Sequence, residues 1–343
     1  MSEGNTRVAI VGGGICGLTV RRSLMRSGFT TELFDKGRSP GGRMSRRQHG
    51  EYQFDHGAQY FTVVGSDFQE LVNRWDAEKF VTPWTARIGV LKDGDWTEAR
   101  TQPVRYVGVP AMNAPAKALA ADADGEVHLQ CRITDAVREQ DGSWSLTDDR
   151  GRSYSGYRFL VITIPPAQAL EILQEPTAVR ATLGGAVVDP CWAVMAVFDP
   201  PLGVDWDAAF VQKGPLAWVA RNGSKPGRPE HDAWVLHATP DWSRQFVEQD
   251  RPWVAAELLQ AFGHALGRNL PAPAWSGAHR WRYARPRTQV PDGYLWDAAL
   301  HLGLCGDWCV GGRLEGAFTS GRLLAEQIRR QAAGRPSHAA QPS

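Results

Sequence analysis

The chain has 343 residues, of which 43% are hydrophobic, and its 38 Lys and Arg nearly balance its 37 Asp and Glu. A chain of this length can bury one large core or two smaller ones. The resulting net charge of +1 gives no strong field toward nucleic acid or an anionic membrane, so neither is expected as a partner. No apolar stretch reaches the roughly 18 residues of a membrane span.

Cysteine use and the start of the chain both predict a cytoplasmic protein. The five cysteines are scattered and odd in number, which is typical of a reducing compartment. Cys305 and Cys309 stand too far from other ligand pairs to predict zinc, so no metal is expected. Only six residues precede the first predicted strand, which leaves no room for a signal peptide.

The first 35 residues predict a dinucleotide-binding unit. Residues 7–11 form an apolar run, GGGICG follows at 12–17, and a second strand at 31–34 ends at Asp35. Glycine lets the backbone approach a pyrophosphate, and the helix that begins near Gly14 directs unpaired N–H groups at it. Asp35 is placed to accept hydrogen bonds from ribose hydroxyls.

The next loop helps to distinguish between cofactors. An acid at position 35 suits NAD or FAD rather than a nucleotide with a 2′-phosphate. In PGGR at 40–43, Gly42 lets the backbone pass close to a cofactor, and Arg43 offers a planar fork to a phosphate or a flavin oxygen.

The middle of the chain alternates helices with short strands. Apolar spacing predicts helices over residues 67–79, 114–121 and 252–265, and Asp93-Gly94 predicts a hairpin within 88–96. Residues 127–137 and 144–146 are predicted to be antiparallel. Residues 159–164 form a buried strand stopped by Pro165 and Pro166. Further strands are predicted over 192–198, 209–212, 217–220 and 234–238, with Trp144, Trp192 and Trp234 in the core.

The C-terminal region predicts a second strand-to-helix turn. LGLCGDW at 302–308 ends in Gly306-Asp307, and a helical pattern follows over 314–329. Asp307 could hold the ribityl hydroxyls of FAD, with the helix N-terminus toward the flavin. An extended FAD needs such a closing element and NAD does not, so the sequence favours FAD.

Together these elements predict an α/β protein with two domains. A Rossmann-like FAD-binding domain is expected over 1–62, 105–170 and 296–333. A mostly antiparallel β substrate domain is expected as an insertion over 63–104 and 171–295, and residues 334–343 as a disordered tail.

Several longer motifs resemble one family. GGRMS at 41–45, DHGAQYFT at 55–62, CGDWC at 305–309 and AHRWRYARP at 278–286 are similar to segments of the bacterial renalases. These belong to the amine-oxidase-like flavoprotein superfamily with the p-hydroxybenzoate-hydroxylase type of fold. The resemblance spans about residues 7–330, and the GAQYFT and HRWRYARP segments make it specific to this family.

The resemblance implies a noncovalently bound FAD and a nucleotide substrate. Bacterial renalases oxidise isomers of NAD(P)H that carry the hydride at carbon 2 or 6, giving NAD(P)+ and, with oxygen, hydrogen peroxide. A dihydronicotinamide becomes aromatic when it loses a hydride, so no general base is required. The preference for NAD or NADP isomers, the physiological electron acceptor and the oligomeric state stay open.

The resemblance also implies a set of site residues. It places Gln59, Tyr60, Asn222 and His237 in the catalytic region and Arg221, Trp281 and Arg282 around the substrate. The residues expected to bind FAD are Gly12, Gly14, Ile15, Cys16, Gly17, Asp35, Lys36, Gly42, Arg43, Gln59, Ile133, Gly306, Asp307 and Gly316.

One departure and three alternatives remain open. His56 stands where relatives carry an apolar residue, and a titratable ring there could change substrate choice or oxygen reactivity. An amine oxidase is the first alternative, because Tyr60, Trp218, Trp281 and Trp308 could enclose an amine. The others are an FAD oxidase of a specialised small metabolite and a flavin-binding protein without turnover.

Overall fold

The computed structural model describes residues 6–99, 103–122, 125–174 and 176–334. It contains two compact units, each built from separate stretches of chain. Unit 1 comprises Met1–Gly42, Ala116–Val187 and Pro286–Ser343, and unit 2 comprises Arg43–Pro115 and Val188–Arg285. These boundaries differ from those proposed from the sequence, because residues 43–62 bond to partners within unit 2. Residues 335–343 of the expected tail lie outside the described residues.

Unit 1 is organised by a six-stranded sheet with the order β19-β20-β13-β1-β2-β9. Its strands are β1 (Arg7–Val11), β2 (Thr30–Phe34), β9 (Val127–His128), β13 (Phe159–Ile162), β19 (Leu295–Asp297) and β20 (Leu302–Leu304). Neighbouring strands are parallel except β19, which is antiparallel to β20. The carboxyl ends of β1, β2, β13 and β20 therefore share one edge.

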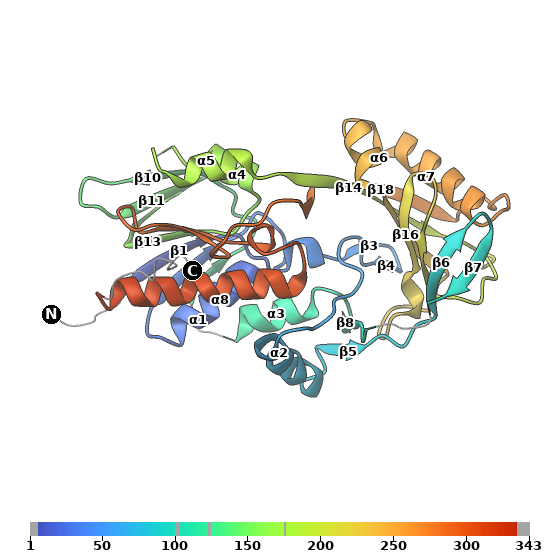
Figure 1. Ribbon diagram of the computed structural model, residues 1–343, viewed down its shortest axis with the longest axis horizontal. Coiled ribbons are helices and arrows are strands. Elements are labelled where there is room, and N and C mark those ends of the chain that lie inside the picture. Colours follow the sequence, from blue (N-terminus) through green and yellow to red (C-terminus); the bar gives the residue numbers. More distant parts are fainter. Residues whose placement is uncertain (1–5, 100–102, 123–124, 175, 335–343) are drawn as a thin grey trace, which may run out of the picture. The chain divides into compact units, whose positions relative to one another are not determined.

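Helices and a second sheet complete unit 1. The helices are α1 (Ile15–Met25), α4 (Pro166–Ile172), α5 (Val179–Gly185) and α8 (Leu314–Ala332). Helix α8 runs alongside α1, although the two are about three hundred residues apart (Figure 1). An antiparallel sheet contains β10 (Ile133–Arg138), β11 (Trp144–Asp148) and β12 (Ser153–Tyr157). The prediction of antiparallel structure from residue 127 was wrong at its start, because β9 joins β2 in parallel.

Unit 2 is organised by a seven-stranded sheet with the order β18-β14-β17-β16-β15-β6-β7. Its strands are β6 (Ile88–Lys92), β7 (Asp95–Glu98), β14 (Val188–Val197), β15 (Ala208–Val211), β16 (Leu216–Arg221), β17 (Ala233–Ala238) and β18 (Trp275–Pro286). The strands from β14 to β15 pair antiparallel, whereas β15 and β6 are parallel. The predicted hairpin at Asp93-Gly94 is confirmed as β6–β7.

Two small antiparallel sheets and three helices complete unit 2. One small sheet is the hairpin of β3 (Arg47–His49) with β4 (Tyr52–Phe54), and the other pairs β5 (Val81–Pro83) with β8 (Tyr106–Gly108), which follows β6 and β7 in the chain. The helices are α2 (Ser66–Ala77), α6 (Pro240–Gln245) and α7 (Arg251–Ala265), and the boundary between the units falls within α3 (Ala114–Ala121). One core cluster joins the sheet to α7 through Trp192, Trp234 and Phe262.

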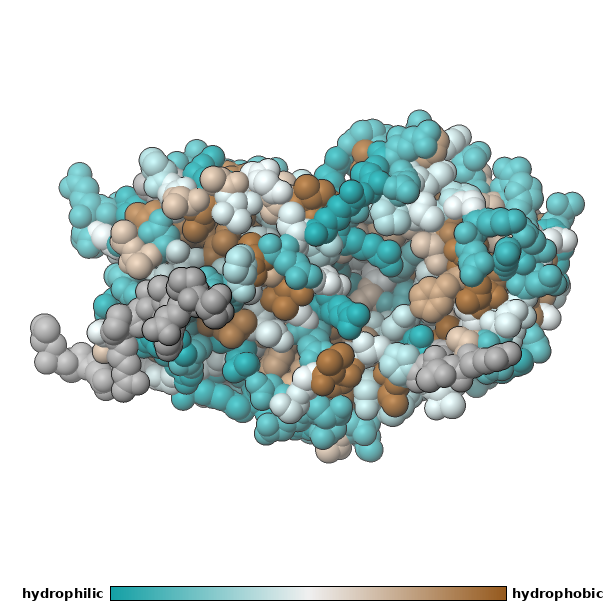
Figure 2. Space-filling view, in the orientation of Figure 1, coloured by the Kyte–Doolittle hydropathy of each residue, from teal (hydrophilic) through white to brown (hydrophobic). Residues whose placement is uncertain are grey.

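The described part of the surface carries scattered hydrophobic side chains. Within the described residues, no helix is long and apolar enough to cross a membrane. The face shown in Figure 2 is mainly hydrophilic, and its hydrophobic areas are small and separated. The large hydrophobic side chains that are exposed are scattered along the chain: Val64, Val104, Val137, Val187 and Phe210.

Candidate functional site

The glycine turn after β1 is closed toward the sheet and open at the start of α1. Gly12 has a φ of +115°, and a Cβ there would lie 2.4 Å from Oγ1 of Thr163. A Cβ on Gly17 would lie 2.0 Å from the carbonyl oxygen of Gly12, so α1 packs directly on the turn. At Gly14 a Cβ would meet no atom within 4 Å. The open space therefore lies where the predicted pyrophosphate would approach.

The start of α1 has the donors that such a phosphate requires. Gly14 is the N-cap, no side chain caps the helix, and its first turn carries no acidic residue. The first N–H groups of the helix are therefore directed at the open space. The Asp35 carboxylate accepts hydrogen bonds from Gly13 N at 2.5 Å and from Gly37 N at 2.6 Å. Each oxygen keeps lone-pair capacity for a ribose hydroxyl, so this segment fits a dinucleotide.

The C-terminal motif lies at the same edge of the sheet. Strand β20 is parallel to β13, which is parallel to β1, so Gly306 and Asp307 follow a strand that ends beside the glycine turn. Gly306 N donates to Oγ of Ser320 at 3.0 Å, which fixes the motif against α8. Sγ of Cys16 lies 3.2 Å from Sγ of Cys305, so the two cofactor motifs contact each other within unit 1.

The remaining members of the predicted FAD set lie nearby or across the boundary. Gly316 is in the first turn of α8, and Ile15 and Cys16 are buried in the first turn of α1. Gly42 is the last residue of unit 1, and Arg43 begins unit 2, where its Nη1 donates to the carbonyl oxygen of Ala284 at 3.0 Å. A contact of Arg43 with FAD stays a prediction.

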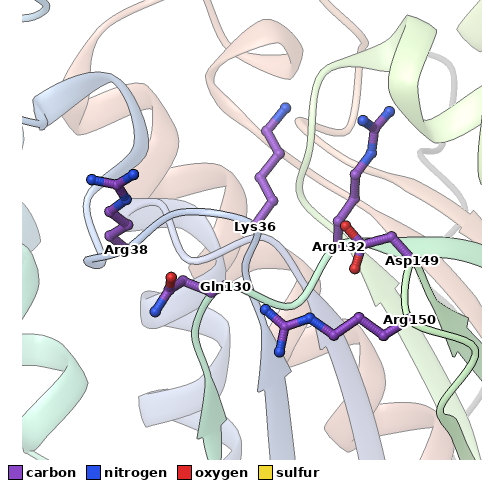
Figure 3. Close-up of a pocket in the computed structure, with 6 residues that line it drawn as sticks. All are labelled: Lys36, Arg38, Gln130, Arg132, Asp149 and Arg150. Atoms are coloured by element: carbon purple, nitrogen blue, oxygen red, sulfur yellow. The ribbon is translucent and has the colours of Figure 1, made fainter.

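A pocket of about 300 Å³ adjoins Asp35. Lys36 and Arg132, from two neighbouring loops, extend in the same direction in Figure 3. The pocket is lined by Lys36, Arg38, Gln130, Arg132, Asp149 and Arg150. Cys131 N donates to the carbonyl oxygen of Asp35 at 2.9 Å, which holds the second loop beside the ribose position. Burial and the charge of Arg132 lower the pKa of Lys36. We expect the adenine end of the cofactor here, next to Ile133 at the start of β10.

In unit 2, the segment after β4 is held by a buried ionic cluster. The Asp55 carboxylate, Lys225 and Arg228 all have fully buried side chains. Arg228 donates from Nη2 and Nε to Oδ2 of Asp55 at 2.6 and 3.1 Å, and Met112 N donates to Oδ1 at 3.0 Å. Burial alone would raise the pKa of Asp55, but Lys225 and Arg228 outweigh it and hold that pKa below its ordinary value.

Two predicted catalytic residues are bonded into this cluster. Lys225 Nζ donates to Oε1 of Gln59 at 3.0 Å and to Oδ1 of Asn222 at 3.3 Å. Gln59 Nε2 donates to the carbonyl oxygen of Gly57 at 3.1 Å. Asn222 Oδ1 also accepts from Asp55 N at 3.1 Å, and its Nδ2 donates to the carbonyl oxygen of Gln53 at 2.9 Å. The cluster thus fixes both amides, and their contact with flavin or substrate stays a prediction.

Tyr60 belongs to an aromatic group in which two of the three rings, those of Tyr60 and Trp84, each have a cation nearby. Its ring centroid lies 5.5 Å from that of Trp218 and 6.4 Å from that of Trp84. The guanidinium of the buried Arg105 lies 4.9 Å from the Tyr60 ring centroid. Lys225 Nζ lies 5.6 Å from the Trp84 ring centroid. Each cation interacts favourably with the negative face of its ring.

His237 and Trp281 meet at one carbonyl group. Trp281 Nε1 donates to the carbonyl oxygen of His56 at 2.9 Å, and Nε2 of His237 lies 3.2 Å from the same oxygen. A carbonyl oxygen only accepts, so Nε2 of His237 carries a hydrogen. Burial lowers the pKa of His237 to about 4. The ring is therefore neutral near pH 7, with Nδ1 as its acceptor.

The two predicted substrate-binding arginines are paired with acids. Arg221 Nη2 donates to Oδ1 of Asp207 at 2.6 Å. Arg282 donates to both carboxylate oxygens of Glu248, at 2.6 and 3.1 Å. Trp281 and Arg282 are consecutive in β18 and so face opposite sides of the sheet. The structure brings Trp281 to His56 and leaves Arg282 with Glu248, so a substrate contact of Arg282 stays a prediction.

Asp55, Lys225 and Arg228 were missed as a group by sequence reasoning. Asp55 precedes Lys225 by 170 residues and Arg228 by 173 residues, so no spacing rule pairs the acid with the two cations. The one available indication was two cations within SKPGR at 224–228, a Pro- and Gly-containing segment. Such cations are ordinarily solvated, and only the fold shows that both are buried.

Comparison with known proteins gives two family matches along the chain. Residues 10–75 match the NAD(P)-binding Rossmann-like domain family, and residues 91–329 match the flavin containing amine oxidoreductase family. The second match covers more than half of the chain. The chain belongs to the flavin-containing amine oxidoreductase family. Its cofactor is FAD, and it is an FAD-dependent oxidoreductase.

Solved structures with low sequence identity share this fold. A provisionally assigned protoporphyrinogen oxidase from Exiguobacterium sp. 255-15 has a TM-score of 0.76 at 14% identity, covering 96% of this chain and 99% of its own. A variant of putrescine oxidase with redesigned cofactor binding has a TM-score of 0.72 at 11% identity, with 95% and 100% covered. A CLA-producing fatty acid isomerase from P. acnes has a TM-score of 0.71 at 11% identity, with 95% and 99% covered. The family's fold therefore extends over nearly the whole chain.

Proposed function

We propose that the protein oxidises carbon-2 or carbon-6 dihydro isomers of NAD(P)H to NAD(P)+, with oxygen as the electron acceptor and hydrogen peroxide as the second product. The proposal includes the p-hydroxybenzoate-hydroxylase type of fold and the cytoplasmic setting expected from the sequence. Its main rival is oxidation of an amine, which the family name suggests.

The cations beside the aromatic rings favour a dihydronicotinamide over an amine as the substrate. An amine is mostly a cation near pH 7, and an aromatic enclosure for it offers free ring faces. Here Arg105 lies against the Tyr60 ring and Lys225 against the Trp84 ring. Both repel a second cation. A neutral dihydronicotinamide ring on an anionic dinucleotide meets no such repulsion.

The ionisable groups of unit 2 also suit a reaction without a general base. Burial lowers the pKa of Lys225 to about 8, and its Nζ is bonded to Gln59 and Asn222. Asp55 is enclosed by the two cations and the Met112 amide. Hydride loss turns a dihydronicotinamide into an aromatic pyridinium and releases no proton, so these groups can remain in their resting states.

The role left to the chain is orientation. FAD, when bound, supplies the two-electron acceptor at N5 and passes the electrons to oxygen. Gln59 and Tyr60 follow the Asp55 cluster directly, so its bonds restrict where their side chains can lie. No side chain has to remove a proton or form a bond in this reaction, so we expect no single substitution here to abolish flavin reduction. Substitutions that weaken contacts with the substrate should change its affinity more than the limiting rate of flavin reduction.

Anaerobic stopped-flow absorbance of the FAD-loaded protein tests the proposal. The protein is mixed with the carbon-2 and carbon-6 dihydro isomers of NAD and of NADP, with ordinary NADH, and with putrescine as an amine. We expect rapid loss of flavin absorbance with at least one isomer and little change with NADH or putrescine. Reduction by putrescine alone, with a rate that rises with pH as the amine loses its proton, would establish the rival function. Rates with a dihydronicotinamide should be nearly independent of pH.

A further inference from the structure

Strand β18 presents a row of rings on one face. Alternate residues of a strand share a face, so Trp275, Gly277, His279 and Trp281 lie on the same side. The His279 and Trp281 ring centroids are 4.4 Å apart, and that of His56 lies 4.6 Å from His279 and 5.0 Å from Trp281. Gly277 adds no side chain to the row. The three rings of His56, His279 and Trp281, here called the imidazole cluster, thus form one contiguous surface within unit 2.

The imidazole cluster contains a buried polar atom without a partner. His56 is 5% exposed, and its Nδ1 has no hydrogen bond within the structure. Its ring is held in place, because its own carbonyl oxygen is bonded to Trp281 and His237. Leaving such an atom unsatisfied is unfavourable, and buried polar atoms in proteins are rarely left so. The His56 ring nitrogen therefore needs a partner that the protein does not itself provide, and a ligand is one such partner.

An uncompensated cation accompanies these rings. Arg47, half-buried in β3, makes no ion pair and no side-chain hydrogen bond with any described residue. Burial lowers the pKa of His279 to about 4 and that of His56 to about 3, and in both cases the charge of Arg47 lowers it further. Arg47 shares a face of β3 with His49, whose ring stacks on Trp275 of β18 with a centroid distance of 4.5 Å, so Arg47 lies on the side of β3 that packs toward this row of rings. The imidazoles of His56 and His279 are neutral near pH 7, so they can donate N–H groups to a ligand but do not neutralise Arg47.

We propose that Arg47, His56 and His279 form a binding site for a phosphate group of the dinucleotide substrate, with Trp281 as its flat wall. The guanidinium offers paired N–H donors in a planar fork, which matches a phosphate, and each neutral imidazole can add one N–H donor. A phosphate bound there neutralises Arg47 and gives the His56 ring the partner that it lacks. That the ligand is a dinucleotide rests on the proposed function. That it is an anion follows from the charge of Arg47 and does not depend on that function.

Two experiments on the FAD-loaded, full-length protein separate the site from the reaction. The first measures binding of inorganic pyrophosphate by titration calorimetry to the wild type, to Arg47→Gln and His56→Gln, and to Arg74→Gln as control. Arg74 is a half-buried arginine of helix α2 in the same unit, outside the proposed site. We expect Arg47→Gln to weaken binding by about tenfold or more, because charge-assisted bonds to phosphate are lost. His56→Gln should weaken it less, and Arg74→Gln should bind as the wild type does.

The second experiment compares donors with and without phosphate. Arg47→Gln should raise KM for a dihydro isomer of NAD about tenfold and leave kcat within about twofold. It should not change KM for the N-methyl dihydronicotinamide of the same isomer, which carries no phosphate. If neither donor reduces the flavin, the proposed function fails while the pyrophosphate titration still decides the site. Pyrophosphate that binds the wild type and Arg47→Gln equally, or binds neither, would overturn the site.

Discussion

The glycine turn of unit 1 and the Asp55 cluster of unit 2 position their surroundings by opposite means. In the turn, side chains are absent: Gly17 packs so closely on Gly12 that a methyl group cannot fit. In the cluster, three charged side chains are enclosed together and every one of them has partners. The first arrangement depends on the space between two backbone segments. The second depends on the attraction of two buried cations to one buried carboxylate. Substitutions should therefore affect the two regions for different physical reasons.

The largest effect is expected from removing the one negative charge of the cluster. Asp55→Asn keeps the shape but leaves Lys225 and Arg228 buried without a counter-ion. Breaking a buried ion pair in this way typically costs 3–5 kcal/mol, so we expect the free energy of unfolding to fall by about that amount. Urea denaturation of the purified variant measures it.

An exposed ion pair provides the control for this experiment. Asp205→Asn removes the acid of the pair with Arg87, whose side chains are 81% and 48% exposed. It should change stability little, because water screens both charges. Equal effects of Asp55→Asn and Asp205→Asn would show that the buried charge is not what stabilises unit 2.

A smaller effect is expected in the glycine turn, where two neighbouring glycines should respond differently. Gly17→Ala places a Cβ 2.0 Å from the Gly12 carbonyl oxygen, so it should destabilise the protein by about 1–3 kcal/mol and release FAD. Gly14→Ala enters open space, so the FAD-free protein should keep its stability while FAD binds more weakly. The flavin absorbance retained after purification and the melting temperature with and without FAD measure both effects. Tight FAD binding by Gly14→Ala would place the pyrophosphate elsewhere.

The response to pH separates the Asp55 cluster from the adjacent histidines. His237, His56 and His279 have folded-state pKa values of about 4, 3 and 4, below the ordinary 6.5. The unfolded chain therefore binds protons that the folded chain does not, and stability is lost as the pH falls from about 6.5 toward 4. Urea denaturation across this range measures the loss.

A double variant assigns part of that loss to the imidazole cluster. His56→Gln with His279→Gln should reduce the pH dependence to the part that His237 contributes, whereas His264→Gln on the exposed side of α7 should leave it unchanged. A pH dependence unchanged by the double variant would mean that these two rings are already protonated in the folded protein.

Most of unit 1 could be predicted from the sequence because its information is local. Glycine spacing at 12–17 and the apolar run before it indicate a strand, a turn and a helix, and these are β1 and α1. The helix predicted over 114–121 coincides with α3, and the strand predicted over 159–164 contains β13. Each of these elements is indicated by a pattern that lies within a few consecutive residues.

The site in unit 2 could be predicted only in part because its information is distant. GAQYF and the 221–222 pair were selected by resemblance, but the bonds that hold Gln59 and Asn222 come from Lys225. The resemblance placed Arg221 and Arg282 around the substrate, whereas in the fold each of them is paired with an acid. Ion pairing between remote segments leaves no periodic pattern in a sequence.

The strand order of unit 1 has a consequence for how the protein is made. Strand β1 ends at Val11, whereas its neighbour β13 ends at Ile162 and β20, on the far side of β13, ends at Leu304. The glycine turn is therefore synthesised long before the strands that complete its sheet. Unit 2 is translated within that interval, so its segments either fold or remain unfolded before the sheet of unit 1 is complete. Loading of FAD is accordingly a late event, and a ribosome-bound chain truncated before residue 302 should not retain the flavin.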